Sequence, residues 1–393
     1  MSGTNLKIVV NRNTPGVVAT FSRLGDVLAL ETNAVNRETV RDADLLIVRS
    51  ETRVDRELLE GSRVRFVGTV TIGTDHIDLD YLQENGIAFA SAPGSNSTSV
   101  AEYVTAALLT WSHRSRTSLK GKILGVVGVG NVGSKVAWAG EALGMRVLLN
   151  DPPRARQTGE ERFLPLDRLM ESDFLSLHVP LTKSGIDATY HLFDERRIRA
   201  MKPSSVLLNT SRGGVVETAA LTNALVSKQL SGAVLDVWEG EPAIDTDLLA
   251  RVTLGTPHIA GYSLDGKLNA VKMVYEEACR FLNVSADWNT GSKAGAGDLP
   301  GIEIPATLSD PAQVVRRAVQ YAYDIELDDT FLRRIEMKNE DERGYYFMKL
   351  RAEYRIRREF AQRTVFLSRG QNEAREVLEK LGFVVAAKGG GNS

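Results

Sequence analysis

Short apolar runs, rich in β-branched residues, alternate with stretches of helical periodicity over most of this chain, a pattern typical of parallel α/β sheets. Four runs within the first hundred residues predict strands at 7–10, 44–48, 64–70 and 87–90. Six later runs predict strands at 123–127, 146–150, 174–179, 205–210, 232–236 and 252–256. Because strands that alternate with helices form parallel, doubly wound sheets, we expect a small α/β domain followed by a larger one.

Two long amphipathic helices are expected to connect these domains. The first follows Pro93-Gly94, and Ser99 stands three residues before Glu102, the spacing of a capping box. Its apolar face holds Val100, Val104, Ala107, Leu108 and Trp111. The second helix begins near Ser263, carries an apolar stripe, and is expected to cross back to the first domain. That stripe consists of Leu268, Val271, Tyr275, Ala278 and Leu282.

At 393 residues the chain is long enough for several domains, each with its own core. The predicted domains are residues 1–100, completed by the helix around 264–285; residues 101–285; and residues 306–387, with two or three helices and a strand at 364–368. Residues 286–305, rich in Gly, Pro and Ala, are predicted to be a linker, and residues 388–393 a disordered tail.

The apolar run at 123–127 leads into Gly128, Gly130 and Gly133, spaced as G-x-G-x-x-G, and a helical pattern follows directly. Glycines at this spacing permit a tight turn, let backbone amides approach a pyrophosphate at the helix N-terminus, and let helix and strand pack closely. Glycine-rich turns also occur as purely structural features. The strand, turn and helix context favours a dinucleotide site in a Rossmann domain.

Asp151 ends the next apolar run, where a carboxylate can accept hydrogen bonds from the adenosine ribose. It would repel a 2′-phosphate by about 4 kcal/mol at a separation of ~4 Å and an effective dielectric constant of about 20. We therefore expect NAD as the cofactor. Arg154 and Arg156 follow closely and could cradle a 2′-phosphate, so NADP is the alternative.

Composition argues against several classes of partner. Lys and Arg number 48 against 50 Asp and Glu, a net charge of −2, so no overall positive field favours nucleic acid or an anionic membrane. Cys279 is the single cysteine, which excludes an intrachain disulfide, and the sequence shows no cluster of metal ligands. With no signal peptide or membrane-spanning apolar run visible, we expect a cytoplasmic protein with a small-molecule substrate.

Three functional side chains each come directly after a predicted strand of the second sheet: Arg212 in NTSRGG, Glu241 in WEGEP and His258 in TPHIAGY. Hydride transfer to a 2-oxo acid needs a guanidinium to hold the carboxylate, an imidazole to exchange a proton, and a carboxylate to orient that imidazole. Singly, these residues could be a surface ion pair, a turn residue and a buried structural histidine. Together, beside a dinucleotide motif, they predict catalytic roles.

Other polar residues are weaker candidates. His76, in the loop TVTIGTDHID, is the main rival to His258, whereas His113, His178 and His191 lack comparable company. That loop and residues 49–52 follow strands of the first domain and could line a cleft or be solvated turns. In the basic segment 343–363, an apolar face favours an assembly or substrate-mouth role over a nucleic-acid helix. That face holds Phe347, Leu350 and Tyr354.

The motifs GVVGVGNVG, NTSRGG, LDVWEGEP and TPHIAGY together resemble the D-isomer-specific 2-hydroxyacid dehydrogenases. DPPRA, HIAGYSLDGK and FMKLRAEYRIRRE are more narrowly similar to a branch that oxidises a phosphorylated 2-hydroxy acid in bacterial pyridoxal 5′-phosphate synthesis. The resemblance implies an α/β fold with a doubly wound Rossmann NAD domain, a smaller flavodoxin-like substrate domain, and an α+β C-terminal domain that forms a homodimer. It implies Arg212 and Glu241 as active-site residues and His258 as proton donor or acceptor.

The resemblance also implies two sets of ligand contacts. NAD is expected at Gly128, Gly130, Asn131, Val132, Gly133, Asp151, Val179, Thr210, Ser211, Arg212, Asp236 and Gly261. The substrate is expected at Ser50, Thr71 and Tyr262. Two alternatives stay open: a dehydrogenase for another D-2-hydroxy acid, such as 3-phosphoglycerate, and a non-catalytic NAD(H)-sensing interaction protein.

Overall fold

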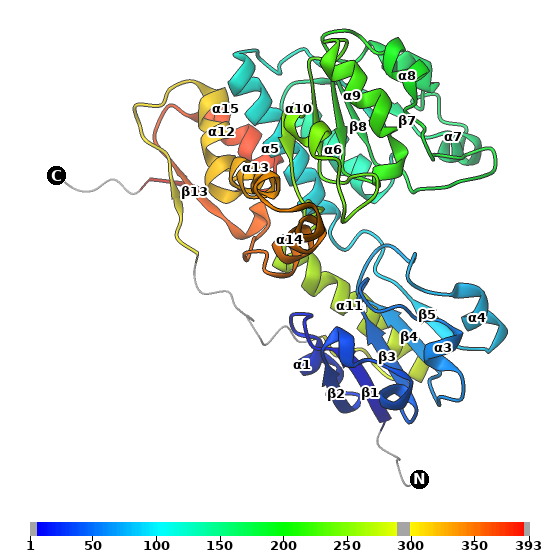
Figure 1. Ribbon diagram of the computed structural model, residues 1–393. Helices are drawn as coiled ribbons and strands as arrows, with labels where there is room; N and C mark the ends of the chain where they lie inside the picture. Colours follow the sequence, from blue (N-terminus) through cyan, green and yellow to red (C-terminus); the bar gives the residue numbers. More distant parts are fainter. Residues whose placement is uncertain (1–5, 289–298, 389–393) are drawn as a thin grey trace. The chain divides into compact units, whose positions relative to one another are not determined.

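The computed structural model describes residues 6–288 and 299–388, which form two compact units (Figure 1). Unit 1 contains the chain up to Asn96 and returns from Ser263 to Leu299; unit 2 contains Ser97–Tyr262 and the chain from Pro300 onward. Half of the predicted linker at 286–305, residues 289–298, lies outside the described residues, and so does the predicted tail at 388–393 except for its first residue. The domain boundaries predicted from the sequence stay predictions.

Unit 1 contains a five-stranded, fully parallel sheet in the order β2-β1-β3-β4-β5, which is the flavodoxin-like order. Its strands are β1 (Leu6–Asn11), β2 (Gly25–Leu30), β3 (Leu45–Val48), β4 (Phe66–Thr69) and β5 (Ala88–Ala90). Only β2 was not predicted. It lies at the edge of the sheet and is half exposed along its length, and its apolar run VLAL contains only one β-branched residue, so the run does not indicate a strand as clearly as the others do.

The helices of unit 1 are α1 (Val17–Phe21), α2 (Arg37–Val40), α3 (Arg56–Leu59), α4 (Leu79–Glu84) and α11 (Leu264–Leu282). The predicted start of the long helix α11 is confirmed, because the Ser263 side chain accepts a hydrogen bond from the amide of Gly266 at 2.8 Å. The apolar stripe of α11 is buried in the same core as β1, β3 and β4, with Val271, Tyr275 and Ala278 almost fully enclosed.

The large sheet of unit 2 is also parallel throughout, in the order β11-β10-β9-β8-β6-β7. Its strands are β6 (Ile123–Val127), β7 (Arg146–Asn150), β8 (Phe174–Leu177), β9 (Val206–Asn209), β10 (Gly232–Leu235) and β11 (Leu254–Gly255). All six fall within their predicted ranges. A single parallel bridge from Leu149 to Phe163 adds one more position beyond β7. The order reverses between β6 and β8, where open α/β sheets bind their ligands.

The helices around this sheet are α5 (Ser97–Ser115), α6 (Asn131–Ala142), α7 (Pro152–Thr158), α8 (Glu195–Ala200), α9 (Thr218–Val226) and α10 (Thr246–Arg251). The capping box predicted for α5 is wrong. The helix begins at Ser97, so Ser99 lies within it. The Glu102 side chain is buried and accepts a hydrogen bond from the amide of Phe360 at 2.6 Å instead.

The C-terminal part of unit 2 is an α+β domain. Its elements are β12 (Ile302–Glu303), α12 (Pro311–Ala322), α13 (Ile325–Arg333), α14 (Glu340–Ala352), β13 (Thr364–Leu367), α15 (Asn372–Lys380) and β14 (Val384–Ala387). The strand at 364–367 was predicted; with its two parallel neighbours it forms the sheet β12-β13-β14. Helices α12 and α13 pack beside α5, and one hydrophobic core runs through both parts of unit 2.

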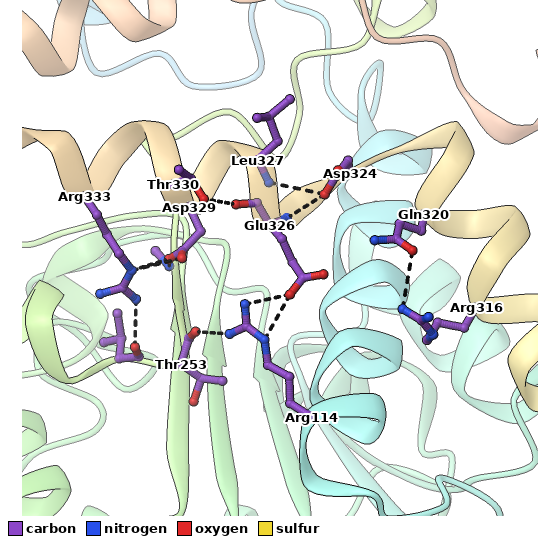
Figure 2. Close-up of polar contacts among 12 residues, drawn as sticks. Arg114, Thr253, Arg316, Gln320, Asp324, Glu326, Leu327, Asp329, Thr330 and Arg333 are labelled. Carbon is purple, nitrogen blue, oxygen red and sulfur yellow. Dashed lines mark hydrogen bonds and ion pairs between the residues drawn. The ribbon is translucent and has the colours of Figure 1, made fainter.

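Helix α13 covers the edge of the large sheet (Figure 2). The Asp329 carboxylate accepts a hydrogen bond from the edge amide of Gly255 at 2.7 Å and is held by Arg333 at 2.9 Å. Nearby, Arg114 of α5 donates to Glu326 of α13 at 2.7 Å. Because an uncovered strand edge leaves amides without partners, these contacts give the C-terminal domain a structural role at β11.

The apolar face predicted in segment 343–363 also packs inside the chain. Phe347 is fully buried in the core that contains Trp238 and Leu248, and Leu350 packs against that core. The Tyr354 hydroxyl donates to Asp328 at 2.8 Å. These side chains therefore do not provide an exposed assembly surface. Within the described residues, no helix combines the length and apolarity needed to cross a membrane.

Candidate active site

The loop after β11 holds His258 in a left-handed backbone conformation, with φ of 57°. Such a conformation costs a non-glycine residue on the order of 1–3 kcal/mol, so its surroundings must hold it in place. The His258 amide donates to the Asp236 carbonyl at 2.7 Å, and the amides of Ile259 and Ala260 donate to the Asp236 carboxylate at 2.8 and 2.9 Å. One buried aspartate thus fixes the course of the loop.

Glu241 orients the His258 ring. One oxygen of its carboxylate lies 2.8 Å from Nδ1 of His258, and the other accepts the amide of Trp238 at 2.7 Å. Burial raises the pKa of Glu241, but the hydrogen bond and charge of His258 and the Trp238 amide outweigh burial and bring the pKa below its ordinary value. Glu241 is therefore an anion at neutral pH. With Nδ1 donating to it, Nε2 of His258 is the nitrogen that can exchange a proton with a ligand.

Arg212 follows β9 in a tight turn built by Asn209. The Asn209 side chain accepts from the Ser211 amide at 3.1 Å and donates to the Arg212 carbonyl at 3.0 Å. A Cβ atom on Gly213 would lie 2.0 Å from the carbonyl of Trp238. Only glycine fits there, so this close approach brings the loop that carries Arg212 against the loop that carries Glu241.

The glycine turn fits a dinucleotide pyrophosphate. Gly128 has φ of 84°, and a Cβ on it would lie 2.5 Å from the carbonyl of His178; a Cβ on Gly133 would lie 1.9 Å from the carbonyl of Gly128. At Gly130 the space is open, with nothing within 4 Å of a Cβ. In the described part of the chain, no side chain caps the N-terminus of α6. An anion can therefore approach its first amides.

Asp151 is placed to hold a ribose. Its two oxygens accept the amides of Val129 at 2.8 Å and Arg154 at 3.1 Å, and each oxygen keeps a lone pair for a ribose hydroxyl. Arg154 donates to the Val129 carbonyl and lies over the Phe163 ring, while Arg156 pairs with Asp187. Both arginines proposed as holders of a 2′-phosphate have partners within the protein, which fits NAD better than NADP.

The other expected NAD contacts lie along the turn and the carboxyl ends of the strands of unit 2. Thr210 bonds the His178 ring at 3.3 Å, and Ser211 is buried against Asn209. The Asp236 side chain is fully buried and accepts the Thr256 hydroxyl at 2.6 Å in addition to the two loop amides. Its role in holding the His258 loop was not predicted. The residues flanking these, Asn131, Val132, Val179 and Gly261, are exposed or partly buried.

The three expected substrate residues are divided between the units. Tyr262 belongs to unit 2, at the end of the His258 loop, whereas Ser50 and Thr71 belong to unit 1. Ser50 is exposed after β3, and the Thr71 hydroxyl donates to the carbonyl of Gly73 at 3.1 Å. Their roles toward a substrate stay predictions, as do the catalytic and cofactor assignments.

The prediction that the other histidines lack comparable company is wrong for His191. Its Nε2 lies 2.6 Å from Glu239, a partner 48 residues away in the sequence. His178 bonds Ser176 at 2.8 Å, and burial lowers its pKa to about 3, so it is a neutral structural imidazole. His76 bonds Thr69 at 3.0 Å, and burial lowers its pKa as well.

The sequence analysis did not identify Arg351 individually as a candidate site residue. From α14 it donates to the Tyr262 hydroxyl at 3.1 Å, and its charge contributes to the lowered pKa of Glu241. The basic character of segment 343–363 was the only sequence signal for it. A cation of the C-terminal domain thus stands beside the His258 loop of the same chain.

Two family models match the chain. The NAD binding domain of the D-isomer specific 2-hydroxyacid dehydrogenases matches residues 97–260, and a domain of unknown function (DUF3410) matches residues 297–382. A D-lactate dehydrogenase from Aquifex aeolicus, solved with NAD and lactic acid, is similar in structure: the TM-score is 0.58, the identity 29%, and the match covers 70% of this chain and 95% of that one. The family model and the structural comparison therefore both indicate the D-isomer-specific 2-hydroxyacid dehydrogenases.

Relatives of full length narrow the family. The erythronate-4-phosphate dehydrogenase of Chromohalobacter salexigens is 43% identical over 97% of this chain and 99% of its own length. The enzyme of the same name from Cronobacter sakazakii is 43% identical over 96% of this chain and 98% of its own. The chain belongs to the erythronate-4-phosphate dehydrogenase family, a branch of the NAD-dependent D-isomer-specific 2-hydroxyacid dehydrogenases.

Proposed function

We propose that the chain oxidises 4-phospho-D-erythronate at C2 to 2-oxo-3-hydroxy-4-phosphobutanoate, a step of pyridoxal 5′-phosphate biosynthesis. The observation that carries the proposal is the contact between Glu241 and His258 at 2.8 Å, on loops that follow strands of the same sheet whose first turn is G-x-G-x-x-G. The name shared by the full-length relatives supports the choice of substrate.

In this proposal each residue has one task. Arg212 holds the C1 carboxylate with its planar guanidinium, which a single ammonium could not match. His258 takes the proton of the C2 hydroxyl on Nε2, and the anion of Glu241 stabilises the imidazolium that forms. When bound, NAD supplies the acceptor for the hydride that leaves C2. Atoms and charges balance in this step. The C2 carbon loses two electrons and a hydrogen as the hydride, which NAD accepts when bound, and the hydroxyl loses its proton to His258.

The distal phosphate needs cations. In unit 2, Arg351 beside Tyr262 is a candidate. In unit 1, Lys267 and Arg49 are candidates: burial and the charge of Arg49 together lower the pKa of Lys267 to about 8, although Glu51 acts in the opposite direction. A phosphate dianion near Lys267 would favour its ammonium form, which supports an anionic ligand in that region.

We also propose that the chain works in the cytoplasm as a homodimer that forms through the C-terminal domain. Large side chains on this domain support a contact surface: Tyr345 is 74% exposed, Ile356 71% and Met337 83%. Light scattering of Tyr345→Glu and Ile356→Glu, which leave the shared core intact, should give monomer where the parent gives dimer. A parent that is already monomeric would contradict the proposal.

A substrate screen tests the proposed reaction. The purified full chain is mixed with NAD, and NADH absorbance is followed with 4-phospho-D-erythronate, D-erythronate, 3-phosphoglycerate and D-lactate. We expect kcat/KM for 4-phospho-D-erythronate to exceed that for D-erythronate and D-lactate at least about tenfold, because these two lack the phosphate and a charged pair to it is worth more than ~1.4 kcal/mol. We expect 3-phosphoglycerate to be a poorer substrate as well, because its phosphate is one carbon nearer to C2. A preference for 3-phosphoglycerate would overturn the substrate assignment alone. No turnover of any of them would overturn the reaction.

A further inference from the structure

One buried arginine of the C-terminal domain lies behind the His258 loop. The side chain of Arg357, in the segment that follows α14, is only 1% exposed. One nitrogen donates to the carbonyl of Ala260 at 3.1 Å and another to the carbonyl of Ser99 at 2.7 Å. Its guanidinium lies over the Tyr323 ring, 3.8 Å from the ring centre. A buried guanidinium is costly unless its donors are used. These contacts use both terminal nitrogens of Arg357, whereas its Nε has no hydrogen-bond partner in the described part of the chain.

Glu102 completes this arrangement. Its carboxylate is 5% exposed, lies 3.5 Å from Arg357, and accepts the amide of Phe360 at 2.6 Å. Glu102 belongs to α5 of the nucleotide-binding part, whereas Arg357 and Phe360 belong to the C-terminal domain. The pair therefore joins the segment around 357–360 to the first turns of α5.

The two carbonyls that Arg357 binds lie near the points where the chain enters and leaves unit 2. Ser99 lies just after the chain enters unit 2, and Ala260 lies just before the chain leaves it. Ala260 also lies between His258 and Tyr262 in the sequence. Its amide is held by Asp236 and its carbonyl by Arg357, so this one residue is fixed on both sides.

We propose that Arg357 is a positioning residue for the acid–base step: it holds the His258 loop against the start of α5, so that the imidazole keeps its contact with Glu241. The C-terminal domain, which matches the model of a domain of unknown function, thereby takes part in catalysis within its own chain. This inference rests on the proposed role of His258. Arg351, which contacts Tyr262, supports the opposite end of the same loop.

The first test compares two arginines of one segment. Arg357→Met removes both carbonyl contacts, and Arg357→Lys keeps the charge but can reach only one of them. Arg355→Met is the matched control, because Arg355 pairs with Asp328 and the carbonyl of Asp324, and none of its hydrogen bonds within the described residues reaches the His258 loop. For Arg357→Met we expect kcat to fall roughly 10- to 100-fold, with KM for NAD changed less than about twofold.

Arg357→Lys should recover part of that loss, and Arg355→Met should keep kcat within about twofold of the parent while lowering Tm. If Arg355→Met lowers kcat as much as Arg357→Met at an equal loss of Tm, the effect is one of general stability and the proposal is overturned. Parent-like kcat in Arg357→Met would overturn it as well.

A second test asks whether Arg357 acts through His258. In a His258→Asn background, Arg357→Met should leave the residual rate unchanged within about twofold, because the group it positions is gone. The same factor of loss in both backgrounds would contradict the proposal. If Arg357→Met does not fold, Arg357→Lys in both backgrounds gives the same comparison. Failure of the proposed function looks different: His258→Asn itself would then be harmless.

Discussion

Two histidine–glutamate pairs lie on neighbouring loops of the large sheet, and they are similar in their contact distance and in the exposure of their side chains. His258 and Glu241 are 2.8 Å apart with side chains 33% and 20% exposed; His191 and Glu239 are 2.6 Å apart with side chains 29% and 30% exposed. Both histidines have a positive φ. A close imidazole–carboxylate contact is therefore not enough to mark an acid–base group.

The difference lies in which ring nitrogen is used and in what holds the loop. His258 gives Nδ1 to its glutamate, whereas His191 gives Nε2 to Glu239 and stacks on Tyr190 with ring centres 4.0 Å apart. Glu239 also accepts the amide of Thr218 at the start of α9, at 3.2 Å. The second pair thus holds loops together. In the first pair, Nε2 of His258 has no hydrogen-bond partner among the described residues, and Asp236 holds the loop.

The largest expected effect separates the two histidines directly. His258→Asn should lower kcat on the order of 10² to 10⁴, because an amide cannot exchange a proton near neutral pH. His191→Asn should keep kcat within about threefold, since it removes only a contact between loops. Steady-state NADH formation by both variants measures this. A loss in His191→Asn as large as that in His258→Asn would remove the distinction.

Arg212, on the loop after β9, gives the next largest effect. Arg212→Lys should lower kcat/KM for the hydroxy acid roughly 10- to 100-fold, because an ammonium cannot hold a carboxylate with two parallel hydrogen bonds. NAD affinity, measured by fluorescence titration, should stay within about twofold. A change in NAD affinity alone would make Arg212 a cofactor residue rather than a substrate residue.

Replacing each glutamate in turn by glutamine should have a smaller effect, seen in the pH dependence of the reaction rate. In Glu241→Gln the charge that favours the imidazolium is lost, so reduction of the 2-oxo acid, which needs a protonated imidazole, should fail at a lower pH than in the parent. Glu239→Gln should leave the profile in place. Rate measurements in the reductive direction across pH 5–9 compare them. Equal profiles for parent and Glu241→Gln would mean that the contact has no electrostatic role.

The smallest effect concerns stability. Burial raises the pKa of Glu239, but the His191 hydrogen bond and the Thr218 amide bring it below the ordinary value. A lowered folded-state pKa stabilises the protein above the ordinary glutamate pKa of about 4.3, and this contribution disappears as pH falls through the folded-state value. Glu239→Gln should therefore lower stability by less than about 1 kcal/mol near neutral pH, since the pair is partly exposed. In urea titrations the gap should close below about pH 4; a gap that widens in acid would contradict this account.

The sequence predicts those parts of the fold that depend on local pattern. All six strands of the large sheet contain apolar runs, buried in five of them and partly exposed in the edge strand β7, and the residues at their carboxyl ends follow from them. The edge strand β2 was not predicted because its run VLAL contains only one β-branched residue. Contacts between residues far apart in the sequence were not predicted either. Glu102 bonds Phe360, 258 residues away, and His191 bonds Glu239, 48 residues away. No local periodicity encodes such partners, since each depends on how finished elements pack.

The protonation of the His258 ring tests the central claim most directly. Long-range ¹H–¹⁵N correlation spectra of the full-length protein, assigned with His258→Asn and His191→Asn, report which nitrogen of each neutral imidazole carries the proton. The contacts predict opposite tautomers: the proton on Nδ1 in His258, facing Glu241, and on Nε2 in His191, facing Glu239. A neutral His258 with its proton on Nε2 would contradict the account, because that nitrogen could not then take the proton of a hydroxy acid.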